Sequence, residues 1–283
     1  MRSRPVVRSI LAQDTSDGAG VRLRRSLGSA EIESLDPFLL LDEFKSERSD
    51  DYIAGFPDHP HRGFETVTYM LAGAMEHKDS RGNRGELTAG SIQWMTAGRG
   101  IIHSEMPRQA DGLMWGFQLW VNLPAREKMR EPRYQDIPAT DVPEVRTDEG
   151  ARVRIVAGEC AGFSGPVSGI VTDPLYLDVR VEKVRSFEQA VPPAHNACAY
   201  VFEGEVELGF EDETAGEAVS AGHLAVFGDG DRVRARPGSG EGRFLLVAAK
   251  PIGEPVARHG PFVMNTRDEI RQAVQDFKEG RLA

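Results

Sequence analysis

The most restrictive feature of this sequence is the short length of its apolar runs. Runs rich in β-branched and aromatic residues, such as residues 64–71 and 91–95, end after a few positions at Gly, Asp, Asn or Pro. The chain of 283 residues contains 30 Gly and 17 Pro, so such interruptions recur throughout. This pattern is typical of short strands joined by turns. The sequence therefore predicts an all-β fold of the sandwich or barrel class.

Proline distribution predicts a division into two domains. The strand-and-turn pattern pauses in a polar segment that carries Pro132, Pro138 and Pro143, and then resumes. Proline stiffens a connection that contributes little to a core, which makes this segment the best linker. A length of 283 residues fits two small domains as well as one large one. We expect one domain over residues 1–131 and a second over residues 132–283.

The end of the chain has a different pattern. Thr266 precedes Glu269 by three residues, which is the spacing of a capping box at a helix start. Apolar residues then recur at helical spacing before Gly280. We expect a short C-terminal amphipathic helix that packs against the second domain.

Composition limits the classes of partner and site. Acidic residues outnumber basic ones by 44 to 34, a formal charge of -10, which disfavours direct nucleic-acid binding. Two cysteines, Cys160 and Cys198, stand far apart and outside any CxxC spacing. We therefore expect buried, reduced cysteines and neither a disulfide scaffold nor a thiolate metal site.

The first residues do not resemble a targeting segment. Their apolar stretch, residues 6–12, is short and is interrupted by Arg8. Such a stretch forms neither the core of a signal peptide nor a membrane span. We expect a cytoplasmic protein that does not associate with membranes.

Three of the seven histidines lie in two clusters with ligand-like spacing. His59 and His61 form an HxH pair, and His103 and Glu105 form an HxE pair. On a strand, residues two apart project from the same face, so each pair presents two ligand atoms to one point. One HxH pair is common by chance, but two such pairs in strand-and-turn contexts predict a site of three imidazoles and one carboxylate.

Longer stretches around these clusters resemble a known family. The order of an HxH pair, a glutamate and a glycine, followed by a glycine-bounded strand and a histidine, is similar to the two metal-binding blocks of the cupin superfamily, a small antiparallel β-barrel. Four stretches resemble the signature segments of the pirin family: residues 17–26, 35–44, 56–65 and 93–100. Pirins are bicupins, so the resemblance implies two cupin-type antiparallel β-barrels, and the capping-box spacing adds the C-terminal helix.

The resemblance also implies a ligand set. The positions that match the pirin ligands are His59, His61, His103 and Glu105, whereas Glu65, a ligand in many other cupins, is not one. Alignment of the second half on the first places Ala190 and Pro192 at the positions of the HxH histidines. It places Ala235 and Pro237 at the positions of the HxE pair. We expect one metal per chain, held by the first domain only.

Imidazole and carboxylate ligands suit Fe(II), Mn(II), Ni(II), Cu(II) or Zn(II), and ligand chemistry does not choose among them. The resemblance favours iron. Several pirins oxidise flavonols as quercetin 2,3-dioxygenases, so the resemblance implies a dioxygenase that cleaves a flavonol such as quercetin with O2 and releases CO. Glu105 is then the candidate general base for the flavonol 3-hydroxyl.

A flat polyphenol needs an apolar, aromatic-lined slot. Candidate lining residues, each of which also fits a role in the core, are Phe56, Trp94, Met95, Trp115 and Phe117. A second class of function stays open, because some pirins are iron-dependent, non-catalytic regulators that bind a transcription factor or a metabolic enzyme. The sequence leaves the physiological substrate, the native metal and the oligomeric state undetermined.

Overall fold

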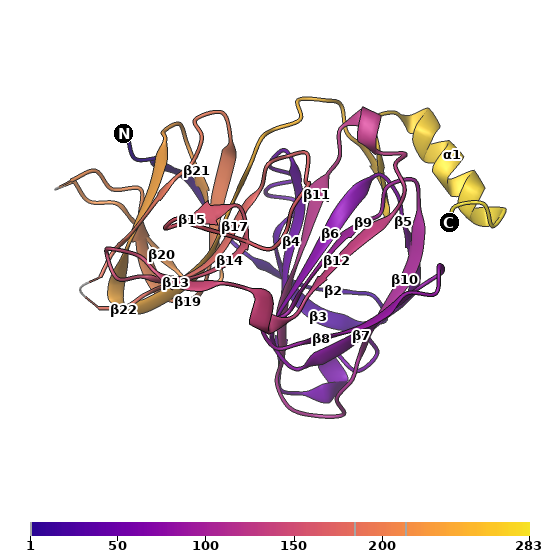
Figure 1. Cartoon of the computed structure of the whole chain (residues 1–283), viewed down its shortest axis with the longest axis horizontal. Helices are drawn as coiled ribbons and strands as arrows, with labels where there is room; N and C mark the ends of the chain where they lie inside the picture. The colour runs from indigo at the N-terminus through magenta and orange to yellow at the C-terminus, as the bar shows by residue number, and fades with distance from the viewer. Residues whose placement is uncertain (1, 184, 213) are drawn as a thin grey trace. The chain divides into compact units, whose positions relative to one another are not determined.

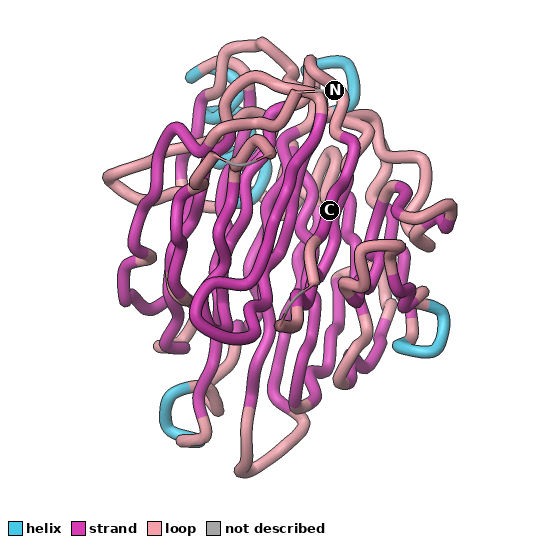
Figure 2. Tube along the Cα trace, turned by 90° about the vertical axis from the view of Figure 1, so that its left-hand side faces the viewer, coloured by secondary structure: helices cyan, strands magenta, loops and turns pink. Residues whose placement is uncertain are grey.

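Antiparallel strands make up most of the chain in the computed structural model, which describes residues 2–183, 185–212 and 214–283 (Figures 1 and 2). The chain divides into two compact units. One comprises Asp14–Ser29, Glu33–Thr140 and Ile252–Ala283, and we call it the histidine unit. The other comprises Met1–Gln13, Ala30–Ile32 and Asp141–Pro251, and we call it the second unit.

Two separate sheets form the histidine unit. The first sheet contains, in spatial order, β12 (Arg133–Ile137), β9 (Ile92–Thr96), β6 (Phe64–Ala72), β11 (Met114–Asn122), β4 (Phe38–Ser46), β3 (Val21–Leu27) and β2 (Gln13–Asp17). The second contains β5 (Phe56–His61), β10 (Ile101–Pro107), β7 (Ala74–Asp79) and β8 (Arg84–Thr88). The unit also has short 3₁₀ turns, η1 (Ser49–Asp51), η2 (Ala125–Glu127) and η3 (Ala139–Asp141), the hairpin of β23 (Ala257–His259) and β24 (Phe262–Met264), and α1 (Arg267–Lys278).

The two sheets face each other across a shared core. Phe44 and Met70 from the seven-stranded sheet cluster with Met75 and Leu87 from the four-stranded sheet. The all-β prediction with one C-terminal helix is confirmed. We expected a closed barrel. In the described residues, however, no ladder of hydrogen bonds joins the edges of the two sheets, so the unit is a two-sheet β-sandwich of the cupin type.

The second unit is built on one large antiparallel sheet. Its strands, in spatial order, are β1 (Val6–Leu11), β21 (His223–Phe227), β19 (Asn196–Leu208), β22 (Arg232–Ala249), β17 (Leu175–Val181), β14 (Arg152–Ala157) and β13 (Glu144–Arg146), with β18 (Phe187–Ala190) on β22 and β20 (Glu217–Ser220) on β19. A small hairpin pairs β15 (Glu159–Cys160) with β16 (Phe163–Ser164). Cys160 and Cys198 are buried and form no disulfide, as expected.

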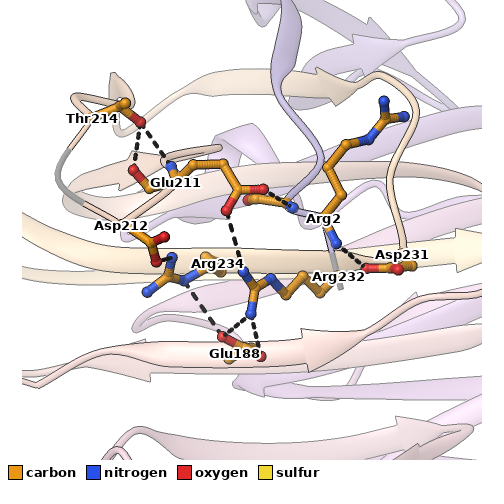
Figure 3. Close-up of polar contacts among 9 residues, drawn as sticks. Arg2, Glu188, Glu211, Asp212, Thr214, Asp231, Arg232 and Arg234 are labelled. Carbon is orange, nitrogen blue, oxygen red and sulfur yellow. Dashed lines mark hydrogen bonds and ion pairs between the residues drawn. The ribbon is translucent and has the colours of Figure 1, made fainter.

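The N-terminal segment belongs to the second unit and not to the domain in which the sequence places it. β1 pairs with β21, and the backbone N–H of Arg2 donates to Asp231 Oδ1 at 2.6 Å. Figure 3 shows the surrounding network, in which Glu188 lies between the guanidinium groups of Arg232 and Arg234. Strand pairing thus fixes the segment to a sheet that is remote in sequence, which a linear boundary does not reveal.

The C-terminal segment also lies in a different unit from the one predicted, because α1 packs within the histidine unit and not on the second unit. The capping box is present: Thr266 Oγ1 accepts from the Glu269 N–H, and Glu269 accepts from the Thr266 N–H. Ile270 and Ala273 of α1 join a core cluster with Phe262 and other residues of the same unit. The helix therefore covers part of the histidine unit and not the second unit.

The second unit lacks a counterpart of the histidine cluster in its described residues. β18 pairs with β22 as β5 pairs with β10, and Ala235 stands opposite Phe187 as His103 stands opposite His59. Register therefore places Phe187, and not Ala190 or Pro192, at the counterpart of an HxH position. Phe187 is buried and its ring contacts Phe244, so apolar packing fills this position. Among the described residues, no helix has the length and apolar character needed to span a membrane.

Candidate metal centre

Three histidines from neighbouring strands meet between the two sheets of the histidine unit. β5 and β10 pair antiparallel, and His59 lies directly opposite His103. His61 lies two residues after His59, so its side chain points to the same side. One ring nitrogen from each of the three lies within 4.8 Å of the others. The structure thus brings together the three imidazoles that the spacing singled out.

Hydrogen bonding and burial at this cluster fit a transition metal. His59 Nδ1 lies 2.8 Å from the Pro57 carbonyl oxygen, so its N–H donates there and its Nε2 presents a lone pair, 3.0 Å from His61 Nε2. Both ring nitrogens of His103 are buried and have no hydrogen-bond partner among the described residues. Burial, and next the neighbouring histidines, hold the pKa of His61 and His103 well below its usual value. Neutral imidazoles with available lone pairs are the form that binds metal ions.

Glu105 lies beside the cluster but outside its group of three. Its side chain is buried, two residues after His103 on β10. Thr68 Oγ1 of β6 donates to Glu105 Oε1 at 3.0 Å, and Gln118 Nε2 of β11 donates to Glu105 Oε2 at 3.1 Å. The facing sheet therefore holds both carboxylate oxygens in place. The role of Glu105 as a fourth metal ligand stays a prediction.

Glu65 points away from the cluster. On β6 it alternates with Thr66 and Thr68, and Thr68 is the residue that reaches Glu105. Glu65 Oε1 instead accepts a hydrogen bond of 2.6 Å from Thr96 on the other face of the sheet. The pleat of β6 thus places the two buried carboxylates on opposite faces of the sheet.

The predicted pocket residues divide between the two faces of the seven-stranded sheet. Met95 stands opposite Thr66 and Tyr134, on the side of the histidines. Trp94 alternates with Met95 on β9, and Phe117 alternates with Gln118 on β11, so both point to the opposite face.

The other two aromatic candidates, Trp115 and Phe56, differ from each other in their surroundings. Trp115 Nε1 donates to Glu43 Oε1 at 2.9 Å, and the Lys45 ammonium lies 3.5 Å from the centre of its ring. Phe56 stands opposite Glu105 and packs against the core cluster that contains Phe44. Of the five residues, Met95 and Phe56 therefore lie on the side of the histidines.

Several residues near the cluster were missed in the sequence. His77 of β7 is buried, and its ring centre lies 5.6 Å from that of His103 and 4.7 Å from that of Tyr134. The centre of the Trp120 ring lies 5.3 Å from that of His61 and 4.4 Å from that of Phe64, whose plane is tilted by 39°. The alternation of β7, with Met75 and His77 on one face, is the signal that could have revealed His77.

A buried lysine supports the turn after His61. Lys128, 1 % exposed, donates from Nζ to Asn122 Oδ1 at 2.6 Å, to the Gly63 carbonyl at 2.7 Å and to the Val263 carbonyl at 3.0 Å. Gly63 has φ +88°, and a Cβ there would collide with the Val263 carbonyl oxygen. Arg62 adds further hydrogen bonds at this turn, because it donates to the Arg99 carbonyl and to Asp276 of α1. Contacts with the C-terminal segment therefore hold the end of β5 in place.

We predict that Lys128→Met destabilises the metal-free protein at pH 7 by about 2–4 kcal/mol, because three buried acceptors lose their donor. Burial lowers the pKa of Lys128 from 10.5 to about 8. The unfolded chain then binds more protons than the folded one between these values, so wild-type stability should rise with pH across that window, by at most about 3 kcal/mol. Urea unfolding from pH 7 to 11 measures both effects. If the stability of Lys128→Met rose with pH as much as that of the wild type, the pH dependence could not come from Lys128.

Comparison with known proteins places this site in a family. The model of the pirin family matches residues 20–121, and that of the pirin C-terminal cupin domain matches residues 176–283. A pirin-like protein of Caulobacter vibrioides is 49% identical over 282 residues, which cover 99% of this chain and 100% of that protein. The chain belongs to the pirin family. This confirms the predicted resemblance and the predicted pair of cupin domains.

Other relatives of this pirin carry names that refer to an activity. A Pseudomonas aeruginosa protein provisionally named quercetin 2,3-dioxygenase is 46% identical over 286 residues, with 100% of this pirin and 99% of that protein covered. A solved structure of quercetin 2,3-dioxygenase from Acinetobacter baumannii matches with a TM-score of 0.89 and 32% identity, over 99% of both chains. A bacterial pirin from Escherichia coli, solved in complex with nickel(II), shares the fold at 19% identity and a TM-score of 0.66, over 86% of this pirin and 99% of that chain.

Proposed function

We propose that this pirin is a metal-dependent dioxygenase that cleaves flavonols such as quercetin with O2. The observation that carries the proposal is the cluster of three converging imidazoles beside Glu105, a buried carboxylate that Thr68 and Gln118 hold in place. The names of the Pseudomonas and Acinetobacter relatives support the same reaction. In this reaction both oxygen atoms of O2 enter the product, the central heterocyclic ring opens, and one carbon leaves as CO.

His59, His61 and His103 would hold the metal, with Glu105 as the proposed fourth ligand. The donor set fits Fe(II), which we propose as the native ion, and it also fits Mn, Ni, Cu and Zn. A divalent metal bound here would supply Lewis-acid and redox chemistry toward the flavonol and dioxygen. One metal per chain is expected, because Phe187 and Ala235 occupy corresponding positions in the second unit.

Glu105 would act as the general base for the flavonol. A proton leaving the 3-hydroxyl would move to a Glu105 oxygen, while the hydrogen bonds from Thr68 and Gln118 keep the carboxylate oriented. Burial of Glu105, 2 % exposed, keeps competing water away from the reacting proton.

Two apolar walls would orient the flat substrate. Trp120 and Phe64 contact each other beside His61 on one side. Met95 and Tyr134 lie in one cluster on the same face of the sheet. We propose these four residues as substrate contacts in place of Trp94 and Phe117, whose side chains point to the other face.

The test is aerobic turnover of quercetin by protein loaded with each candidate metal in turn. Loss of the flavonol absorbance, O2 uptake and CO release should proceed in equal amounts and faster than with the same concentration of free metal. His223→Ala, in the second unit, is the matched control and should keep the wild-type rate. Metal binding with no turnover above free metal would overturn the enzyme proposal and favour the regulatory, protein-binding alternative. Cytoplasmic location stays a prediction.

A further inference from the structure

The second unit contains a cavity that the metal chemistry does not use. Its volume is about 810 Å³, within the roughly 300–1,000 Å³ that small-molecule sites occupy. It lies at the end of β18, where Gln189 and Val191 line it, and against the loop between β16 and β17. Val167, Ile170 and Leu175 supply apolar walls. A molecule with an apolar body fits such a lining.

One wall of this cavity carries a polar pair with a gap between its atoms. His195 Nε2 lies 3.8 Å from Asp173 Oδ2, which is too far for a direct hydrogen bond. Asp173 has φ +49°, a conformation that few residues other than glycine adopt. Burial lowers the pKa of His195, against the opposing effect of Asp173, and so favours the neutral imidazole. His195 Nδ1 is buried and has no hydrogen-bond partner among the described residues, so we assign the ring proton to Nε2. The pair then offers one N–H donor and one carboxylate acceptor.

The charge of the lining selects among ligands. Glu159, Asp173 and Asp231 line the cavity, and none of its lining residues is Lys or Arg. An anion would therefore meet like charge in the lining, and the cations that act on His195, Arg4 and Lys250, stand outside it. An ammonium group can donate to Asp173 but cannot accept from His195, whereas a hydroxyl group does both.

We propose that this cavity binds an uncharged small molecule that has an aromatic or aliphatic body and a hydroxyl group, that is, a phenol or an alcohol. The hydroxyl bridges the gap, accepting from His195 Nε2–H and donating to Asp173 Oδ2. The apolar body lies against Val167, Ile170 and Leu175. The site is independent of the metal centre, because all of its residues belong to the second unit.

Calorimetric titration of metal-free, full-length protein with naphthol tests this site, and naphthoate serves as the anionic probe with the same ring system. Naphthol should bind the wild type at least tenfold more tightly than naphthoate does. Ala190→Trp places an indole at an exposed lining position and should weaken naphthol binding at least tenfold. Ala194→Trp, which adds the same side chain outside the lining, is the control and should leave the affinity unchanged.

Two further variants test the polar pair and the independence of this cavity from the metal centre. Asp173→Gly removes a side chain that is 83 % exposed, and glycine adopts φ +49° without strain, so the variant should fold, yet naphthol binding should weaken several-fold. His103→Ala should bind naphthol as the wild type does, which keeps this test separate from that of the dioxygenase. The proposal is overturned if the wild type does not bind naphthol, if Ala190→Trp and Asp173→Gly bind it as tightly as the wild type, or if His103→Ala alone abolishes binding.

Discussion

Replacing His103 by alanine is expected to lower bound metal from about one ion per chain to about a tenth or less, and to remove flavonol cleavage with it. His103 supplies one of the three converging ring nitrogens. Elemental analysis of protein purified without chelators gives the metal content, and quercetin turnover gives the activity. The His59→Ala, His61→Ala double variant should show the same loss.

His77→Ala is the matched control, because His77 is also a buried histidine on a neighbouring strand but lies outside the group of three. It should keep its metal. The metal-free forms of wild type and His103→Ala should melt at similar temperatures, because the buried ring nitrogens of His103 have no partner to lose among the described residues. Added metal should then stabilise the wild type and not His103→Ala. Loss of metal in His77→Ala, or full metal content in His103→Ala, would refute the ligand set.

Replacing Glu105 by glutamine should reduce turnover by about 100-fold or more, because an amide keeps the shape of the carboxyl group but cannot accept the flavonol proton. Metal content should stay above half of the wild-type value, since three imidazoles remain. Steady-state kinetics beside elemental analysis separate the two effects. A wild-type rate in this variant would exclude Glu105 as the base.

Glu65→Gln provides the comparison for Glu105. Glu65 is equally buried and also bonds a threonine hydroxyl, but it faces the other side of the sheet. Burial raises the pKa of Glu65, so its carboxyl group is closer to the neutral form that an amide imitates. Turnover of quercetin by Glu65→Gln should stay within a few-fold of the wild-type rate. A loss as large as that of Glu105→Gln would show that the effect comes from disturbing a buried carboxylate in general.

Local sequence was sufficient to find the three histidines that converge in the structure and insufficient to find their surroundings. His59 and His61 share a face because strand residues alternate, and this rule needs no tertiary information. Trp94 and Phe117 obey the same rule, but alternation alone does not say which face of β9 or β11 is turned toward the histidines. That depends on the register with β6, where Thr68 reaches Glu105.

Residues that come from other strands had little local signal. Alternation on β7 places His77 on the same face as Met75 but does not identify His103 as its neighbour. Nothing in the β11 segment marks Gln118 as a neighbour of Glu105 or Trp120 as a neighbour of His61. Lys128 reads as a solvated charge in a polar segment, yet it is buried with three acceptors that the fold collects from the start of β6, from β11 and from β24. Long-range packing decides these contacts.

By itself the sequence determined the all-β class, the capped C-terminal helix, the HxH and HxE spacings and the family, because each depends on residues close together in the chain. Tertiary structure alone decided which parts of the chain fold together. β1 completes the sheet of the second unit, and α1 joins the histidine unit through Arg62 and Asp276. Strand pairing and buried ion pairs act between residues of any separation, so a boundary drawn along the chain at residue 132 could not reproduce the two compact units.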